Sequence, residues 1–452
     1  MTAGTASAPG PGQLELLRSL TGLRDNPLAF LQDAAARYGD LVHFRLGRWD
    51  AFVLSRPEDI QHVLQDNHRN YTKDTLQYNG LAAVTGRGLL TSDGDIWLRQ
   101  RRRMQPAFHR QRIHAFGPLM AQAAVSKAAA WQPAASSGAL LDIDQEMMEL
   151  ALEILGKALL GVDLRTEAPA LTSAVLTALD HVVNGLKSPD VLPNFIPTPR
   201  KRRFRQALAR LDAAVQEIIQ AHRRPDYQPG PVGDLLDTML RALEGDTPMT
   251  DQQLRDELIT ILIAGHETVA SALTWAAYLL AQNPDVEARM LAELDSVLGG
   301  RDPGVDDLPA LDYTRRVFDE TLRLYPPAWI VTRKNIAEDT LSGARIPPGS
   351  LVVVSLVTAQ RNPAYWPDPE RFDPDRFLPE AAAGRPRYAY LPFGGGPRLC
   401  IGNTFALTEA PLILASIYQR YRLALEPGRP VIVDPLVTLR PRGGLHMRVV
   451  TR

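Results

Sequence analysis

The only cysteine of this 452-residue chain, Cys400, lies in a glycine-rich segment that constrains the fold more than any other feature. Residues 393–402 read Phe-Gly-Gly-Gly-Pro-Arg-Leu-Cys-Ile-Gly. Three consecutive glycines let the backbone turn tightly and approach a flat partner closely. Helical composition resumes at 403–414, so the cysteine lies near a helix N-terminus, where N–H groups stabilise a thiolate. An inert buried cysteine would need neither the glycines nor Arg398, so the pattern favours an anionic sulfur bound to a metal.

A single cysteine also excludes an internal disulfide framework and a zinc or iron–sulfur site built from several cysteines. The formal net charge of -1 indicates no nucleic-acid partner. Residues 1–12 are small, polar and rich in Pro and Gly, without the apolar core of a signal peptide. The longest strand-like apolar run, 351–357, is too short to cross a membrane. We therefore expect a cytoplasmic protein with at most peripheral membrane contact.

The pattern along the chain predicts a mainly α fold with small β-sheets, in one domain over residues 26–452 after a flexible segment at 1–25. A short helix is expected at 28–35, and strands at 41–46 and 51–54 flank a Gly47 turn. From 111 to 298 the composition is helical, with interruptions at Pro133, 187–199 and 225–233. Strands are expected again at 350–357 and 431–439.

The helix that begins after Thr250 is the clearest single element of the sequence. Thr250 and Gln253 fit a capping box, and the apolar run 258–280 predicts a buried helix. Within that run lies Ala-Gly-His-Glu-Thr at 264–268, where a charge and a hydroxyl in a buried helix need a reason. Gly265 weakens the helix there and favours a local opening.

Five motifs together resemble cytochromes P450. Residues 393–402 resemble the cysteine-ligand signature of that family. Four further motifs follow in family order: Trp-Leu-Arg-Gln-Arg at 97–101, Ala-Gly-His-Glu-Thr at 264–268, Glu-Thr-Leu-Arg at 320–323 and Pro-Glu-Arg-Phe at 369–372. The resemblance extends from Pro27 to the C-terminus and implies the helix-rich triangular prism of the family around a buried haem. The cysteine signature is highly specific on its own. Singly, Trp97 fits an ordinary core residue, Arg101 a solvated basic run, and Glu320 with Arg323 a surface pair; the order of all five motifs argues against that.

The resemblance implies haem b as cofactor, O2 as co-substrate and a role for each motif residue. Cys400 would be the axial metal ligand, and Thr268 and Glu267 would handle oxygen and protons. The residues implied in cofactor binding are Trp97, Arg101, Arg333, Phe393, Arg398, Cys400 and Gly402. Those implied in a buried structural ion network are Glu320, Arg323 and Arg371. Val269 stands where many relatives carry a second hydroxyl residue, which changes only the local water network.

The segments that line the substrate pocket in the family are mostly apolar here, which fits a large lipophilic small molecule. The residues expected there are Gln77, Tyr78, Leu89, Val183, Leu186, Ala264, Trp329, Ile330 and Leu445. Stretches at 85–91, 264–275, 322–330 and 437–441 resemble bacterial β-carotene hydroxylase P450s. They imply hydroxylation of the β-ionone ring of a carotenoid, at C2 or C3, in carotenoid biosynthesis. The alternative is a fatty-acid hydroxylase, which the general sequence style also resembles.

Electrons are expected from NAD(P)H through a separate ferredoxin or flavodoxin and its reductase. About fifty residues follow Cys400, too few for a flavin or ferredoxin domain. Five arginines near 97–101 form either a basic patch for such a partner or an ordinary solvated face: Arg99, Arg102, Arg103, Arg110 and Arg112. The apolar and basic segment 191–203 is a candidate for membrane contact, although a solvated helix start fits it as well.

Three further hypotheses remain from other classes. A haem sensor or carrier would need no proton relay, so Glu267 and Thr268 argue against it. A peroxide-driven enzyme is less favoured because the acid and alcohol are both present. His266 and Glu267 form half of a zinc-protease motif, but Ala270 stands where the second histidine is required.

Overall fold

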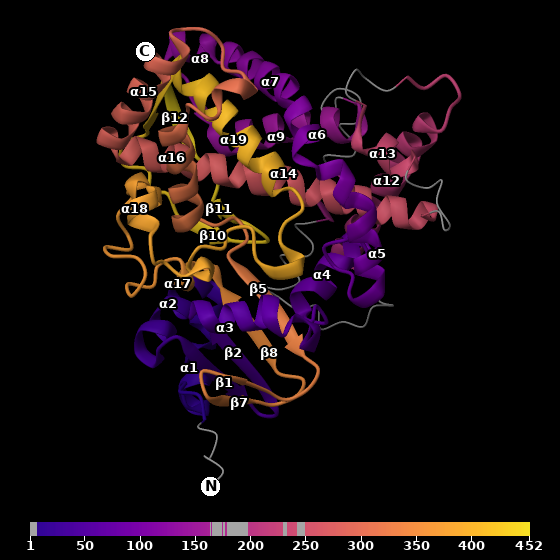
Figure 1. Ribbon diagram of the computed structural model, residues 1–452, viewed down its shortest axis with the longest axis vertical. Coiled ribbons are helices and arrows are strands. Elements are labelled where there is room, and N and C mark those ends of the chain that lie inside the picture. Colours follow the sequence, from indigo (N-terminus) through magenta and orange to yellow (C-terminus); the bar gives the residue numbers. More distant parts are fainter. Residues whose placement is uncertain are drawn as a thin grey trace. The chain divides into compact units, whose positions relative to one another are not determined.

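The computed structural model describes residues 7–162, 164, 174, 177–178, 198–228, 233–241 and 249–452. By its internal contacts the chain divides into two compact units. Unit 1 comprises Met1–Tyr78, Asp319–Cys400 and Asp434–Leu439, and unit 2 comprises Asn79–Phe318, Ile401–Val433 and Arg440–Arg452. Each unit is described by itself below, with the elements labelled in Figure 1.

Unit 1 is built on a five-stranded sheet in the order β1-β2-β8-β5-β3. The antiparallel pair β1 (Leu41–Leu46) and β2 (Trp49–Leu54) turns at Gly47, whose φ of 62° favours glycine. Strand β2 runs parallel to β8 (Leu351–Ser355), which is antiparallel to β5 (Ile330–Asn335). The sheet covers a buried apolar core, and the remaining strands of the unit are β3 (Tyr71–Thr72), β6 (Asp339–Leu341) and β7 (Ala344–Ile346).

Helices surround this sheet, and the first of them differs from the expected flexible segment 1–25. Residues Gln13–Asp25 form helix α1. Leu16 is buried, and Glu15 is bound by Arg37 (2.6 Å) and by the Tyr38 hydroxyl (3.0 Å) of α2. These contacts hold α1 on its neighbour. Among the described residues, the other α-helices that lie wholly in unit 1 are α2 (Pro27–Tyr38), α3 (Pro57–Gln61), α17 (Leu356–Ala359) and α18 (Pro379–Ala382).

Unit 2 is mainly helical and is centred on α14 (Asp251–Gln282). The capping box of Thr250 and Gln253 is present, as the sequence predicts. This helix is long and apolar enough to cross a membrane, but most of its apolar window is buried inside the protein, as in a core helix. It packs on α9 (Ile143–Leu160), and α7 (Gly117–Ala130) packs on α19 (Asn403–Tyr418), as Figure 1 shows.

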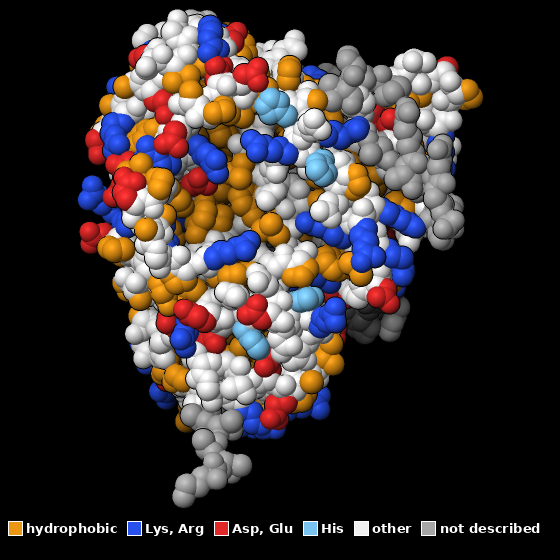
Figure 2. All heavy atoms as spheres, viewed as in Figure 1, with side chains coloured by type: hydrophobic (Ala, Val, Ile, Leu, Met, Phe, Trp, Pro, Cys, Tyr) orange, Lys and Arg blue, Asp and Glu red, His pale blue; other side chains and the backbone are white. Residues whose placement is uncertain are grey.

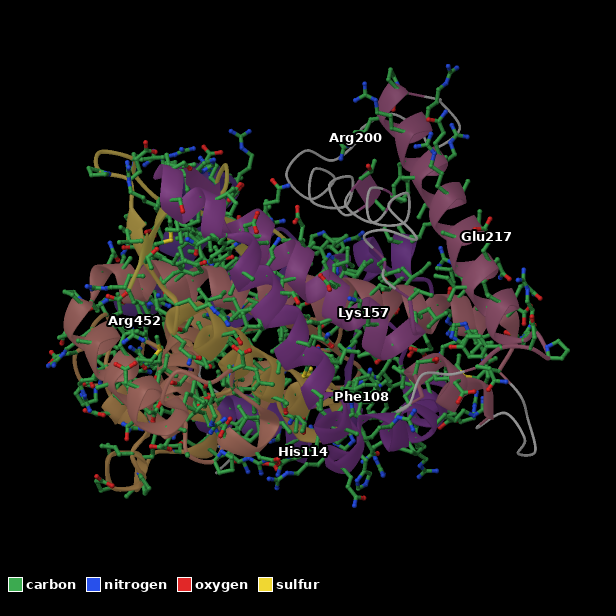
Figure 3. All side chains as sticks on the ribbon, turned by 90° about the horizontal axis from the view of Figure 1, so that it is seen from above. Phe108, His114, Lys157, Arg200, Glu217 and Arg452 are labelled. Carbon is green, nitrogen blue, oxygen red and sulfur yellow. The ribbon has the colours of Figure 1, made fainter. Side chains whose placement is uncertain are left out.

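The remaining helices of the unit cover this centre. They are α5 (Gly94–Met104), α6 (Arg110–Ala115), α8 (Gln132–Ser137), α12 (Pro199–His222), α13 (Leu235–Arg241) and α15 (Pro284–Leu298). Glu217 projects from α12 in Figure 3 and is exposed. Pro133, expected to interrupt a helix, lies in the first turn of α8, where proline is tolerated.

A three-stranded antiparallel sheet closes unit 2, in the order β4 (Leu140–Asp142), β12 (His446–Thr451) and β9 (Tyr421–Leu425). The strand expected at 350–357 is β8, and the one expected at 431–439 is two short strands, β10 (Val433–Pro435) and β11 (Leu439–Pro441). Two helices span the unit boundary, α4 (Leu76–Thr85) and α16 (Asp312–Leu324). The prediction of a mainly helical fold with small sheets is confirmed.

Candidate active site

The glycine segment presents the sulfur of Cys400 at an accessible position. The backbone N–H of Cys400 donates to the carbonyl of Phe393 at 3.0 Å, which closes the segment into a loop. Gly394 and Gly396 have φ values of 72° and 64°, which glycine adopts without strain. A Cβ on Gly396 would lie 2.0 Å from the carbonyl oxygen of Leu64, so no larger residue fits. The loop is thus held rigidly, and α19 begins at Asn403, directly after Gly402.

Unit 1 also holds a buried cation, Arg333 of β5, which is only 6 % exposed. Its Nη1 donates to the carbonyl of Thr332 (2.8 Å) and to the hydroxyl of Tyr78 (3.3 Å). In the part of the chain that the structure describes, no carboxylate pairs with this guanidinium. A buried positive charge requires a negative partner, so Arg333 is suited to hold an anionic group. Arg398, beside Cys400 in the loop, is partly exposed.

The predicted ion network is present with one member exchanged. Arg323 donates to Glu320 at 2.6 and 2.8 Å, and both side chains are fully buried. Arg371, expected as the third member, is exposed and contributes only its backbone carbonyl, which accepts from Arg323 at 3.1 Å. The cation that approaches Glu320 is Arg376, at 3.4 Å. Burial raises the pKa of Glu320, although the hydrogen bonds and charge of Arg323 oppose the rise.

One face of α14 is exposed at the middle of the helix. Ala264 is exposed and Thr268, one turn later, is partly exposed, whereas most of their helical neighbours are buried. The Thr268 hydroxyl donates to the Ala264 carbonyl at 2.7 Å. Gly265 does not open the helix: a Cβ there would lie 2.7 Å from Leu155 of α9, so glycine serves close helix packing. Glu267 is 6 % exposed beside this open face.

His266 forms no zinc site. Its Nδ1 is hydrogen-bonded to the carbonyl of Leu262, and burial lowers the pKa of His266 to about 4. Among the described residues, no group of three or more His, Cys, Asp or Glu side chains could hold a metal ion. Cys400 therefore stays the candidate metal ligand within the described part of the chain.

Helix α5 carries the predicted pair Trp97 and Arg101, one turn apart and partly exposed. Figure 2 shows Lys and Arg side chains gathered over this helix, where Arg99 and Arg102 are exposed. Arg112 does not belong to a free basic patch, because its Nη2 donates to the backbone carbonyl of Asp234 at 3.0 Å.

Two of the expected substrate-pocket residues have their polar groups engaged within unit 1. Gln77 accepts from the hydroxyl of Thr332 at 2.8 Å and donates to the carbonyl of Ile330, and Trp329 donates to Leu436. The amide of Gln77 binds strand β5 and keeps one N–H available in the described chain, whereas the single N–H of Trp329 is already used.

The other pocket predictions fall on several elements. Tyr78 is buried below the guanidinium of Arg333. Leu89 and Leu445 are buried in unit 2. Val183 and Leu186 lie outside the described residues, as does most of the segment 191–203.

The sequence did not predict a set of polar contacts at the start of α14. Glu257 and Asp256 accept from the backbone N–H groups of Leu89 (2.9 Å) and Arg87 (2.8 Å), and Arg255 donates to Val84 at 3.0 Å. Three successive ionisable residues thus hold residues 84–89, which include the expected pocket residue Leu89. The charged run 255–257 at the entry to an apolar helix was the available signal.

Comparisons with known proteins agree with this arrangement. The model of the family "Cytochrome P450" matches residues 8–446. The chain is 40% identical to cyclooctatin synthase of Streptomyces melanosporofaciens, over 95% of this chain and 92% of that protein. It is 37% identical to pentalenene oxygenase of Streptomyces avermitilis, over 100% and 98%. The crystal structure of CYP175A1 from Thermus thermophilus superposes with a TM-score of 0.79 at 32% identity, covering 98% of this chain and 100% of that chain. The chain belongs to the cytochrome P450 family.

Proposed function

We propose that this P450 monooxygenase hydroxylates a terpenoid hydrocarbon, with the thiolate of Cys400 as the ligand of a haem iron. Family membership establishes the coarser part: a haem-containing monooxygenase that uses O2 and hydroxylates a lipophilic substrate. The single observation that carries the assignment of the ligand is the loop of Cys400, which presents an accessible sulfur from a backbone fixed by left-handed glycines. The terpenoid class and the residue roles are our proposals.

The residues present fit a haem. Arg333 is a buried guanidinium without a carboxylate partner in the described chain, which suits a propionate. Phe393 would pack beside the sulfur. Arg333 and Arg398 of unit 1 are cations suited to propionates, and Trp97 and Arg101 of α5 in unit 2 are proposed donors of the same kind. When bound, the haem would supply the oxidising power for inserting one oxygen atom, favoured by an anionic sulfur ligand.

The chain's own contribution is the delivery of protons and the exclusion of water. The Thr268 hydroxyl uses its hydrogen on Ala264, so its oxygen lone pairs are free to accept a hydrogen bond. Glu267, next to it on α14, is buried enough to be shielded and would supply protons at its carboxyl group. Most helical neighbours of this face are buried, and the exclusion of bulk water would fall to them.

Support for a terpenoid substrate comes from the relatives, whose names refer to cyclooctatin and pentalenene. Neither name refers to a carotenoid. Hydroxylation of a carotenoid ring at C2 or C3 is therefore a narrower proposal within the terpenoid class. Leu89 and Leu445 in unit 2, and Ile330 in unit 1, are apolar side chains of the kind that either substrate requires. A fatty-acid chain is the alternative that the substrate test must separate.

Product analysis in three hosts tests the substrate. The enzyme is co-expressed with ferredoxin and ferredoxin reductase, and the host cells supply NAD(P)H. One host makes a cyclic terpene hydrocarbon, the second makes β-carotene, and the third makes neither and is supplied with fatty acids. A new terpene alcohol supports the proposal, and a hydroxylated β-ring supports its narrower form. Hydroxy fatty acids alone would overturn it. A flavodoxin system and peroxide are compared in parallel, since turnover with peroxide only would indicate a peroxide-driven enzyme.

The ligand is tested by the spectrum of the reduced carbon-monoxide complex. Wild type is expected to give the thiolate-ligated band, and Cys400→Ser to lose it while binding haem. Trp97→Phe serves as the matched control, because it removes a proposed propionate donor and leaves the sulfur in place. An unchanged band in Cys400→Ser would refute the assignment of Cys400.

A further inference from the structure

Three polar side chains at the C-terminal end of α12 form a buried cluster that the proposed function does not use. His222 is the last residue of α12, and Tyr227 and Asp234 come from the chain that follows it. The side chains of His222 and Asp234 are each 1 % exposed. Polar groups buried this deeply depend on partners within the protein, so the hydrogen atoms of the cluster must be shared among its own acceptors.

The contacts of the cluster meet at the hydroxyl of Tyr227. Its oxygen lies 2.5 Å from Oδ2 of Asp234 and 2.8 Å from Nε2 of His222. Nε2 also lies 3.3 Å from the same oxygen of Asp234. Nδ1 of His222 lies 2.8 Å from the carbonyl oxygen of Ile218, one turn earlier in α12. Both nitrogens of the imidazole are therefore within hydrogen-bond distance of oxygen atoms.

The number of available hydrogen atoms determines the charge of His222. The hydroxyl of Tyr227 has one hydrogen, and it donates this hydrogen to Asp234 in the shorter of its two contacts. The oxygen of Tyr227 then accepts from Nε2, and the carbonyl of Ile218 can only accept, so both nitrogens of the imidazole carry hydrogen. His222 is therefore a cation that pairs with the carboxylate of Asp234, and its place at a helix C-terminus also favours that charge.

The cluster joins the end of α12 to two other helices of unit 2. Oδ1 of Asp234 accepts from the N–H of Asp237 at 2.6 Å in the first turn of α13, which lies beside α12 in Figure 1. The end of α9 is also close, because a Cβ on Gly161 would lie 3.0 Å from the hydroxyl of Tyr227 and 3.2 Å from the carboxylate of Asp234. Loss of the cluster would therefore loosen α12 from both α13 and α9.

The groups within the cluster favour the ion pair. Burial lowers the pKa of His222, but hydrogen bonds to Asp234 and to the Ile218 carbonyl outweigh it and raise the pKa above its ordinary value of 6.5. The negative charges of Asp234 and Asp237 add to this rise. Burial raises the pKa of Asp234, but hydrogen bonds from His222 and Tyr227 outweigh it and lower the pKa overall.

The nearby arginines leave this ion pair intact. Arg112 approaches from α6 and donates to the backbone carbonyl of Asp234 at 3.0 Å, whereas the carboxylate of Asp234 is bound by the cluster. Arg223, which follows His222 directly, is turned toward Asp251 and pairs with it at 2.6 Å. The imidazolium is therefore the cation that lies against the carboxylate of Asp234.

We propose that His222, Tyr227 and Asp234 form a pH-sensitive latch, in which the protonated imidazole holds the C-terminal end of α12 against α13 and α9. When the proton on Nε2 is lost to solvent, the single hydrogen of Tyr227 cannot serve both Nε2 and Asp234, so one buried acceptor lacks a hydrogen bond. The buried carboxylate also loses its cation. The latch is therefore closed below the pKa of His222 and opens as the pH rises through it. It acts whatever the substrate is, so it does not depend on the proposed function.

Two measurements on the wild-type holoprotein test the latch. The rate at which the C2 hydrogen of His222 exchanges with deuterium, followed by mass spectrometry, gives the pKa of this residue. Backbone amide exchange in peptides covering 213–228 and 234–241, from about pH 6 to about pH 9 and corrected for intrinsic exchange, reports the opening of the latch. His222→Gln/Asp234→Asn removes both charges of the latch. His114→Gln, which replaces an exposed histidine of α6, is the matched control.

We expect His222 to titrate above 6.5 and amide exchange in both peptides to increase with the same midpoint. The increase should be about tenfold for each unit by which the pKa of His222 exceeds its ordinary value, because protonation and closure are linked. Corrected exchange in His222→Gln/Asp234→Asn should not change with pH, since neither side chain titrates. His114→Gln should follow wild type.

A pKa of His222 at or below 6.5 in the wild-type protein would overturn the inference, and so would corrected amide exchange that does not change with pH. An increase with pH that persists in folded His222→Gln/Asp234→Asn would assign the effect to another group and would also overturn it. The wild-type measurements need no substitution, so they remain decisive if the double variant fails to fold. Neither measurement requires turnover, so failure of the proposed function would leave both readouts unchanged.

Discussion

Replacement of Glu257 by glutamine should stabilise the protein relative to wild type, and this difference should grow as the pH rises. Glu257 is fully buried on α14, and one carboxylate oxygen accepts from Leu89 while the other has no hydrogen-bond partner in the described chain. Burial raises the pKa of Glu257 from 4.5 to about 8, against the Leu89 hydrogen bond and with help from the charge of Asp256. The folded protein therefore holds a proton at neutral pH that the unfolded chain has lost.

The sign follows from this difference in bound protons. Between about pH 4.5 and 8 the folded state binds one more proton than the unfolded state, so stability falls by about 1.4 kcal/mol per pH unit. The contribution of Glu257 is fully present below pH 4.5 and is lost as the pH rises through 8. Over that range the loss reaches about 5 kcal/mol. Glutamine keeps the acceptor for Leu89 and does not titrate, so Glu257→Gln avoids the loss.

Urea unfolding of both holoproteins at pH 5.5, 7 and 8.5 measures the effect. The difference in unfolding free energy should grow with pH in favour of Glu257→Gln, by about 3 to 4 kcal/mol between pH 5.5 and 8.5. Glu217→Gln, on the exposed side of α12 (Figure 3), is the control and should follow wild type. Parallel pH profiles for wild type and Glu257→Gln would refute the neutral buried carboxyl group.

Three further sets of substitutions test other parts of the structure. Arg323→Met should cost about 3–5 kcal/mol of unfolding free energy, because buried Glu320 loses both hydrogen bonds from Arg323 and keeps only Arg376, at 3.4 Å, as a nearby cation. Gly396→Ala should lower haem content and thermal stability, since its Cβ would lie 2.0 Å from a backbone oxygen; normal haem content would contradict this. Charge reversal at Arg99 and Arg102 should raise the apparent KM for ferredoxin several-fold at low salt, with little change at high salt.

Most of the structural features that the sequence predicts correctly follow from local patterns. The capping box at Thr250 places the start of α14, and the glycine segment around Cys400 is as tightly turned as expected. Strands β1 and β2 fall at the expected residues around Gly47. These features depend on neighbours in the chain, so their residue types are sufficient to predict them.

Pairings across long separations could not be predicted in the same way. Arg371 and Arg376 lie close to each other in the sequence, so the local pattern allows either of them to pair with Glu320. Only the path of the chain shows that Arg371 turns outward. The sequence predicts Gln77 as a polar contact for substrate, but its amide accepts from the N–H of Thr332 and donates to the carbonyl of Ile330 on β5, more than 250 residues away. The local sequence does not contain this information.

Helix α14 is buried along nearly its whole length, so it must find a partner for each of its charges. Asp256 accepts from the backbone N–H of Arg87 and from Arg255, whereas Glu257 accepts from the N–H of Leu89 and keeps its proton at neutral pH. These contacts position a proposed pocket segment, and Glu267, later on the same helix, is the proposed proton donor. A substitution that shifts α14 along its axis would therefore change substrate preference and proton delivery together, whereas a substitution at Leu89 alone would change the first and spare the second.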